Sequence, residues 1–198
     1  MPSESKTDLV ADQLTPEEQT FLLVLARSSI EQTLEGKDLI PLVFDDLPAA
    51  LRQQCSSFVT LKIEERLRGC VGSLEALLPL AEDVRRHAIG AALFDYRFPP
   101  LKLGELPGVR IEISRLKPPR RLHYTCPEDL LLALRPGIDG VVLIDEPRRA
   151  TFLPKVWQTV PEPDVFLSLL CQKMGAHPDT WRQKMLTILT YDVEDFYE

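Results

Sequence analysis

The sequence lacks the features of membrane and secreted proteins. None of its 198 residues lie in an uncharged apolar run of about 18, the length that a bilayer-spanning helix needs, so we expect no membrane segment. Residues 1–15 are polar and acidic without an apolar stretch, which is unlike a secretory signal. The few cysteines are widely separated, so we expect reduced thiols in the cytoplasm rather than a disulfide scaffold: Cys55, Cys70, Cys126 and Cys171.

The signatures of several enzyme classes are also missing. There is no glycine-rich dinucleotide loop, no P-loop, no Gly-x-Ser-x-Gly elbow and no zincin helix. The chain has three histidines, and only His123 and Cys126 have a spacing that could form one edge of a metal site. A zinc site needs three or four ligands. We therefore predict no metal and no cofactor.

Basic residues are fewer than acidic ones, with 23 Lys and Arg against 30 Asp and Glu, for a net charge of −7. This balance argues against a dedicated binder of duplex DNA. One local exception places five basic residues within twelve positions, and it could hold RNA or another anionic ligand. A solvated rim is the alternative interpretation of the same residues: Arg110, Arg115, Lys117, Arg120 and Arg121.

Glycine is scarce and proline abundant, with 9 Gly against 17 Pro. Four prolines stand at or just before expected helix starts, and others punctuate connections, which indicates rigid loops. Thr15, Pro16 and Glu18 predict a capped helix that runs to Gly36, with Phe21, Leu22, Leu25, Ser29 and Ile30 on its inner face. Further helices are expected at 78–94, 127–134 and 164–174.

Short β-favouring runs predict two hairpins, 58–63 with 66–71 and 141–144 with 149–153, and strands at 109–116 and 185–193. Helices and strands are mixed without strict alternation. The expected fold is therefore α+β, a mainly antiparallel sheet with packed helices and room for a smaller second lobe. We expect a flexible N-terminal tail over 1–14 and a single domain over 15–198.

The densest unusual segment surrounds Cys70. In a strand, period-two alternation would put Arg68 and Cys70 on one face, where the guanidinium would favour the thiolate. Gly69 and Gly72 would leave the backbone open to a substrate. The alternative is that Cys70 is a small buried hydrophobe and that Gly69 marks a bulge.

Leu67 to Gly72 resembles the Leu-Arg-Gly-Cys-Ile-Gly signature of the AMMECR family, named from the AMME-syndrome candidate region and also known as AmmeMemoRadiSam system protein A. The resemblance continues in order along the chain and spans roughly residues 17–197, through segments 79–80, 88–92, 97–100, 106–107, 111–114, 135–140 and 148–157. It implies a compact α+β protein with a main antiparallel sheet and a smaller lobe.

The resemblance also implies a modification pathway shared with a radical S-adenosylmethionine protein and a Memo-like protein. The hypothesis is then a cleft centred on Cys70, with Cys70 as nucleophile or covalent carrier and Arg68 as thiolate stabiliser. Glu112 is a candidate proton handler or ion-pair partner, and Gly69, Gly72 and Arg97 are candidate substrate contacts. A non-catalytic adaptor or binding module, and an RNA-binding accessory protein, remain alternatives, so whether this chain is an enzyme stays open.

Overall fold

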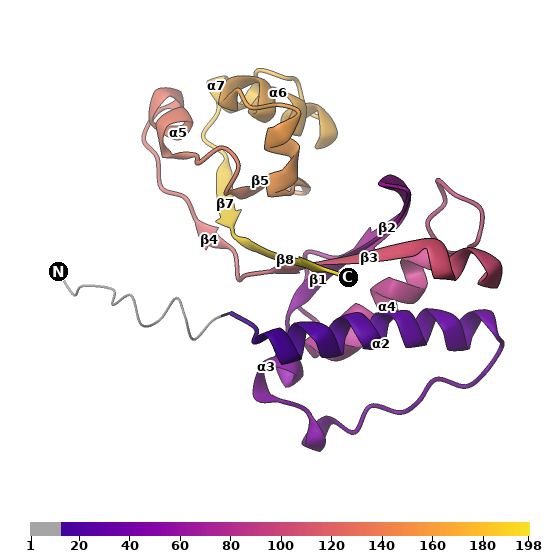
Figure 1. The fold of residues 1–198 in the computed structure, drawn as a ribbon. Coiled ribbons are helices and arrows are strands. Elements are labelled where there is room, and N and C mark those ends of the chain that lie inside the picture. The colour runs from indigo at the N-terminus through magenta and orange to yellow at the C-terminus, as the bar shows by residue number, and fades with distance from the viewer. Residues whose placement is uncertain (1–12) are drawn as a thin grey trace. The chain divides into compact units, whose positions relative to one another are not determined.

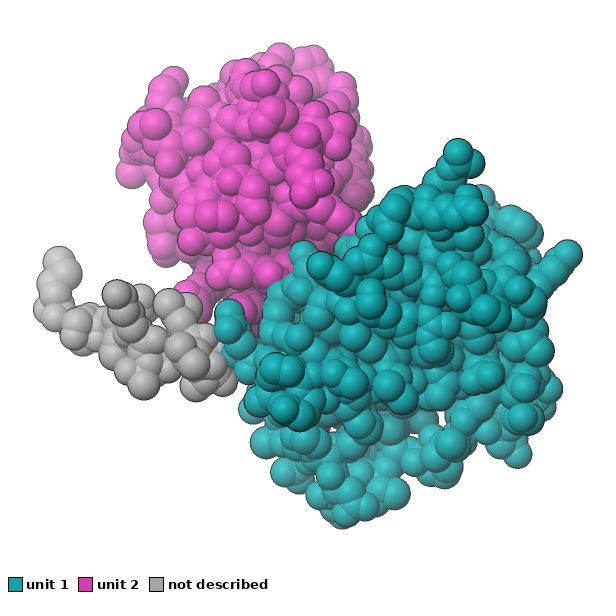
Figure 2. All heavy atoms as spheres, viewed as in Figure 1, with its two compact units in different colours: residues 1–116, 194–198 teal, residues 117–193 magenta. Residues whose placement is uncertain are grey.

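The computed structural model describes residues 13–198, so most of the tail expected over 1–14 lies outside the described residues. Leu14, at its end, is buried, and its backbone N–H donates to the Glu194 carboxylate at 3.0 Å. The chain divides into two compact units, unit 1 (1–116 with 194–198) and unit 2 (117–193), coloured separately in Figure 2. The single domain expected over 15–198 stays a prediction.

Unit 1 is a four-stranded sheet with two main helices on one side (Figure 1). The strand order is β2-β1-β3-β8, and β1 is antiparallel to both β2 and β3. Its elements are α2 (Pro16–Leu34), η1 (Phe44–Asp46), α3 (Ala49–Arg52), β1 (Ser56–Ile63), β2 (Arg66–Gly72), α4 (Leu80–Leu93), η2 (Leu103–Gly108), β3 (Val109–Leu116) and β8 (Val193–Tyr197).

Local sequence explains how these elements begin and turn. The capping box at α2 is confirmed: the Thr15 hydroxyl accepts from the Glu18 N–H at 3.2 Å, and the Glu18 carboxylate accepts from the Thr15 N–H at 2.8 Å. The first predicted hairpin is also confirmed. Its two-residue turn places Glu64 and Glu65 at φ of 51° and 62°, the left-handed conformation that fits the twist of paired strands.

The apolar core of unit 1 lies between the sheet and its helices. α4 packs on β1 and β2, and α2 packs on α4 and β3. The sheet contributes Val59, Leu61, Ile111 and Ile113, all without measurable exposure. The inner face of α2 differs from expectation, because Ala26 is buried while Phe21 is 38% exposed. The shorter side chain at position 26 lets the helix lie closer to its neighbours.

Unit 2 is a second four-stranded antiparallel sheet, of order β4-β7-β5-β6, with small helices. The Glu146–Pro147 peptide between β5 and β6 is cis. Trp157 stacks on Phe166 with 3.7 Å between ring centroids at the centre of this core. Its elements are β4 (Arg120–Arg121), α5 (Pro127–Ala133), β5 (Gly140–Asp145), β6 (Arg148–Phe152), η3 (Pro154–Gln158), α6 (Pro163–Lys173), α7 (Thr180–Gln183) and β7 (Thr187–Tyr191).

The α+β fold with antiparallel sheets is thus confirmed, with one difference near the C-terminus. The strand expected over 185–193 is β7, and a separate strand, β8, follows Asp192 and joins the other sheet. Within residues 13–198 no helix combines the length and apolarity needed to cross a membrane.

Candidate functional site

Cys70 lies on the edge strand β2 and points to the sheet face opposite α4. Its two neighbours face the helix: a Cβ on Gly69 would stand 2.1 Å from the Ala91 carbonyl oxygen, and Val71 packs against Gly90. Because side chains alternate along a strand, the Cys70 sulfur projects to the other side. We call this side of the unit 1 sheet the polar face, and it carries Thr60, Lys62, Cys70, Glu112 and Ser114.

Three of these side chains form one row across three strands. Thr60 of β1 pairs with Cys70 of β2 and, on its other side, with Glu112 of β3. The buried Thr60 hydroxyl donates to the Cys70 sulfur at 3.3 Å, and the thiol itself is half-buried. A hydroxyl donor at this position stabilises a thiolate more than a neutral thiol.

The backbone of Cys70 is held by an ion pair from beyond the end of α4. Its N–H donates to Asp95 Oδ2 at 2.8 Å, and its carbonyl oxygen accepts from Arg97 Nη2 at 3.2 Å. Asp95 and Arg97 are themselves joined, with Nη2 2.6 Å from Oδ2. These hydrogen bonds hold the pKa of the Asp95 carboxyl well below its usual range and raise the pKa of Arg97. Arg97 therefore does contact Cys70, and the contact is with the Cys70 backbone.

Arg68 lies near Cys70 in sequence but its guanidinium has other partners. The β1–β2 register passes from Gly69 opposite Leu61 directly to Leu67 opposite Lys62, so Arg68 is the extra residue of a bulge. This bulge interrupts the alternation expected to place Arg68 beside the thiol. The guanidinium donates to both oxygens of Glu105, at 3.0 and 3.2 Å, and to the Pro99 carbonyl at 2.9 Å. Arg68 correspondingly lowers the pKa of Glu105.

Glu112 is ion-paired with Lys62, whose Nζ lies 2.7 Å from Oε2, and not with Arg68. It stands two strands from Cys70, about 10 Å between backbones at ordinary strand spacing. Direct proton transfer needs donor and acceptor within about 3.2 Å. Glu112 is therefore too far from the Cys70 sulfur for direct proton transfer.

Both glycines of the signature are required by close packing. A Cβ on Gly69 would collide with the α4 backbone, and a Cβ on Gly72 would lie 2.3 Å from the Phe58 ring. The structure accounts for both glycines without a ligand. The substrate contact expected of Gly69 and Gly72 stays a prediction.

The basic segment is divided between the two units. Arg110 pairs with Glu65 and stacks over Tyr197, and Arg115 is buried with Glu194 at 3.0 Å. Arg120 and Arg121 are exposed on β4 of unit 2, after Lys117. Only part of the expected anion-binding segment thus presents charge to solvent.

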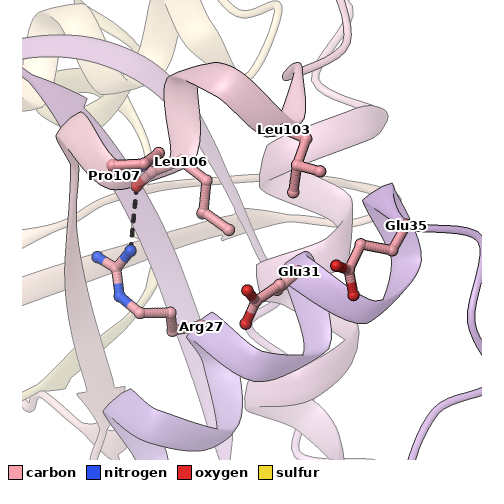
Figure 3. Close-up of a pocket in the computed structure, with 6 residues that line it drawn as sticks. All are labelled: Arg27, Glu31, Glu35, Leu103, Leu106 and Pro107. Carbon is pink, nitrogen blue, oxygen red and sulfur yellow. Dashed lines mark hydrogen bonds between the residues drawn. The ribbon is translucent and has the colours of Figure 1, made fainter.

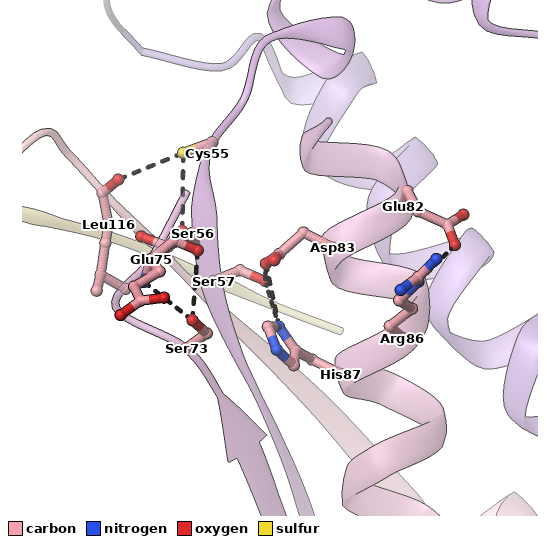
Figure 4. Close-up of polar contacts among 10 residues, drawn as sticks. All are labelled: Cys55, Ser56, Ser57, Ser73, Glu75, Glu82, Asp83, Arg86, His87 and Leu116. Carbon is pink, nitrogen blue, oxygen red and sulfur yellow. Dashed lines mark hydrogen bonds and ion pairs between the residues drawn. The ribbon is translucent and has the colours of Figure 1, made fainter. Parts of the chain in front are cut away.

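A buried polar cluster lies on the helix-covered side of the same sheet (Figure 4). Asp83 Oδ2 accepts from the Ser57 hydroxyl at 2.7 Å and lies 3.0 Å from His87 Nδ1. Cys55 is 7% exposed, and burial raises the pKa of its thiol. Ser57 has no exposed surface, so this cluster braces β1 against α4 and offers no nucleophile to a substrate.

Each unit has a pocket that lies away from Cys70. One of about 310 Å³ is lined by residues of α2 and η2, among them Glu31, Leu103 and Pro107 (Figure 3). The other, about 530 Å³, lies in unit 2 beside His123, Asp129 and Leu132. Among residues 13–198 no three His, Cys, Asp or Glu side chains are grouped as metal ligands would be.

Sequence reasoning missed three residues that contact the site: Thr60, Asp95 and Glu105. Asp95 lies two positions before Arg97, within the segment that follows α4. This spacing could have identified Asp95, because an acidic side chain two positions before an arginine can pair with it. Thr60 could be found only from the register of β1 against β2, which is fixed by the turn at Glu64 and Glu65.

Known proteins resemble this chain along nearly its whole length. The AMMECR1 family model matches residues 23–196. A protein of Thermofilum pendens is 35% identical over 94% of this chain and 92% of its own length, and one of Methanothermobacter thermautotrophicus is 35% identical over 93% and 96%. The crystal structure of an uncharacterized protein from Pyrococcus horikoshii superimposes with a TM-score of 0.83, at 32% identity and 93% coverage of both chains. The chain therefore belongs to the AMMECR1 family.

Proposed function

We propose that this chain is a cytoplasmic component of a modification pathway and that Cys70 is its nucleophile or covalent carrier. The observation that supports this most is the row of Cys70, Thr60 and Glu112, in which a hydrogen-bond donor meets the sulfur and a carboxylate lies further along the same line. The backbone of Cys70 is in addition held by two charged side chains. Together these contacts restrain the Cys70 backbone and give its sulfur a hydrogen-bond donor.

The chemistry required is nucleophilic attack by sulfur. The thiol gives its proton to solvent, the thiolate forms the new bond to an electrophilic atom of the substrate, and the leaving group departs with the electron pair. Thr60 stabilises the anionic sulfur, and Glu112 with Lys62 contacts the far end of the substrate. Arg68 acts on this site through Glu105 and the 99–105 segment, which it ties to β2.

The pathway partners are those that family membership suggests, a radical S-adenosylmethionine protein and a Memo-like protein. The cytoplasmic assignment is supported by the four free cysteines, since a reducing compartment maintains thiols.

Covalent capture tests the proposal. The chain is isolated from cells that also produce both partner proteins, its free thiols are blocked at lysis, and each cysteine peptide is mapped by mass spectrometry. The expected result is an added mass on Cys70 that is missing from Cys126, the other half-buried thiol. An unmodified Cys70, together with undiminished partner binding by Cys70→Ser, would favour the adaptor instead.

One observation favours the adaptor as a second candidate function. Phe94 and Tyr96, on either side of Asp95, are 75% and 95% exposed, and aromatic side chains are enriched at the centres of protein interfaces. Under this hypothesis Tyr96→Ala weakens partner binding at least tenfold and Cys70→Ser leaves it unchanged. The nucleophile hypothesis predicts that Cys70→Ser abolishes the modification whatever the binding.

Binding of RNA or another anion near Arg120 and Arg121 is a third proposal, supported by the exposure of both side chains on β4. It predicts that affinity for RNA falls steeply with salt and that Arg121→Gln reduces this slope by about one. An RNA affinity that does not change with salt concentration would rule out this proposal.

A further inference from the structure

The outer edge of β2 is closed at Cys70 by side chains and not by another strand. β2 is the first strand of the order β2-β1-β3-β8, so within residues 13–198 its outward N–H and C=O groups have no ladder partner. Both outward groups of Cys70 are nevertheless hydrogen-bonded, the N–H to Asp95 and the C=O to Arg97. Cys70 and Thr60 therefore form a non-hydrogen-bonded pair, the kind in which facing side chains come closest. This geometry accounts for the 3.3 Å contact between the Thr60 hydroxyl and the sulfur.

The two side chains form a closed ring of hydrogen bonds with the Cys70 peptide. Asp95 Oδ1 accepts from the Arg97 backbone N–H at 3.1 Å and from Nε at 2.9 Å, while Oδ2 accepts from Nη2 and from Cys70. Arg97 Nη2 then returns to the Cys70 carbonyl. The Asp95 side chain is 4% exposed and Arg97 44% exposed. The negative group of the ring, the Asp95 carboxylate, is thus buried, and the positive group, the Arg97 guanidinium, faces solvent.

The charges of this ring act on the thiol as well as on the backbone. Cys70 is close enough to Arg97 for a thiolate to raise the pKa of the guanidinium, although Asp95 contributes the larger effect. The pKa of Asp95 lies far below neutrality because Arg97 and two backbone N–H groups donate to it. Asp95 and Arg97 thus both stay charged across the whole range in which a thiol titrates.

We infer that Asp95 and Arg97 are positioning residues for Cys70, a charge-balanced clamp that sets both the orientation of the sulfur and the electrostatic field it experiences. The inference rests on the proposed function, since it assigns these residues a role in the reactivity of Cys70. A simple edge cap, which blocks unwanted strand pairing, would need the hydrogen bonds but not the balance of charge.

Substitutions of Asp95 and Arg97 distinguish the charge-balanced clamp from a simple edge cap. Asp95→Asn keeps an acceptor for the Cys70 N–H but leaves the Arg97 charge uncompensated beside the sulfur. Arg97→Gln keeps a donor and leaves the Asp95 charge uncompensated. The probe is iodoacetamide, and the rate of Cys70 alkylation in the full chain is followed from pH 5 to 10 by peptide mass spectrometry. Arg86→Gln, which removes a surface guanidinium paired with Glu82, is the matched control.

The clamp predicts shifts of opposite sign. The midpoint of the alkylation profile moves down by about 1 pH unit in Asp95→Asn and up by about 1 unit in Arg97→Gln, and the control leaves it unchanged. Shifts of the same sign in both variants, or no shift in either, would overturn the inference and leave an edge cap. Arg97→Gln alters an exposed side chain and tests the sign even where Asp95→Asn folds poorly.

A second measurement is independent of reactivity. Hydrogen exchange at the Cys70 amide is expected to accelerate at least tenfold in Asp95→Ala and to be restored towards the wild-type rate in Asp95→Asn, which keeps the acceptor. An exchange rate that Asp95→Ala leaves unchanged contradicts the clamp. The proposed function fails in a different way, by equal labelling of Cys70 and Cys126 in the wild-type chain, and that result does not affect the two opposite shifts.

Discussion

The two faces of the unit 1 sheet are made by alternate residues of the same strands and differ in almost every property. The face under α2 and α4 carries Val59, Leu61, Ile111 and Ile113, which are completely buried. The polar face carries a thiol, two hydroxyls and an ion pair within the same span of strand. One face therefore supplies hydrophobic stabilisation, and the other carries the polar side chains of the candidate site.

The two cysteines near this sheet, Cys55 and Cys70, also differ. Cys55 donates weakly to the Leu116 carbonyl at 3.3 Å, is buried, and has a raised thiol pKa. Cys70 is half-buried and receives a hydrogen bond from Thr60 instead of giving one. The same residue type is thus buried in one place and half-buried in the other.

The largest expected effect is on the helix-covered face. Ile113→Ala removes a completely buried side chain and should lower the free energy of unfolding by about 2–5 kcal/mol, measured in urea. Lys62→Gln, on the polar face, should cost less than about 1 kcal/mol, as for other partly exposed ion pairs. Equal costs for the two variants would break the distinction between the faces.

The next effect concerns the clamp and depends on pH. Because the pKa of Asp95 is depressed in the folded chain, its contribution is complete above the unfolded value of about 4 and is lost as the pH falls towards the folded value. Asp95→Asn should lower the free energy of unfolding by about 1.5–3 kcal/mol at pH 7. The difference from wild type should be constant from pH 8 to 5 and shrink below about pH 4. A difference that grows on acidification would show that Asp95 is not held as the carboxylate.

A smaller effect is expected from the buried polar cluster. Ser57→Ala removes a donor to Asp83 while His87 remains, so the expected loss of stability is about 1 kcal/mol. Cys70 alkylation should not change, since Ser57 faces the helices. A slowed alkylation rate in this variant would mean that the two faces are coupled. Ser73→Ala serves as the control, because it removes the hydroxyl of a serine that follows β2 and is less buried than Ser57.

The smallest effect on stability, and a specific one on reactivity, is expected at Thr60. Thr60→Val keeps the shape and removes the hydroxyl that donates to the sulfur, so Cys70 alkylation should slow by about three- to tenfold at neutral pH. Thr60→Ser keeps the donor and should retain the wild-type rate. Equal alkylation rates in Thr60→Val and Thr60→Ser would show that the hydroxyl does not affect the reactivity of Cys70.

Sequence patterns identified those elements whose signals are local. The capping box of Thr15 and Glu18, the alternation of β3 and the proline-initiated helices are all encoded within a few residues, and the structure contains them. The break at Asp192 was missed because β-favouring residues flank it on both sides, Tyr191 before it and Val193 after it, and only pairing with different sheets separates β7 from β8.

The site was predictable in part for the same reason. Cys70 could be selected from its glycine-flanked segment, but the bulge at Arg68 depends on how β2 pairs with β1, and period-two alternation does not reveal it. Glu105 and Asp95 come from segments 37 and 25 residues from their partners, Arg68 and Cys70. Contacts of this range follow from packing and not from local spacing.

We propose Cys70 as the reactive thiol of this protein. The decisive measurement is the ratio of iodoacetamide labelling rates at Cys70 and Cys126 in the folded, full-length chain at pH 7.5, each followed by peptide mass spectrometry. Both thiols are half-buried, so exposure alone predicts a ratio near one. A reactive Cys70 is expected to label about tenfold faster than Cys126, or more. A ratio of one or less would contradict it.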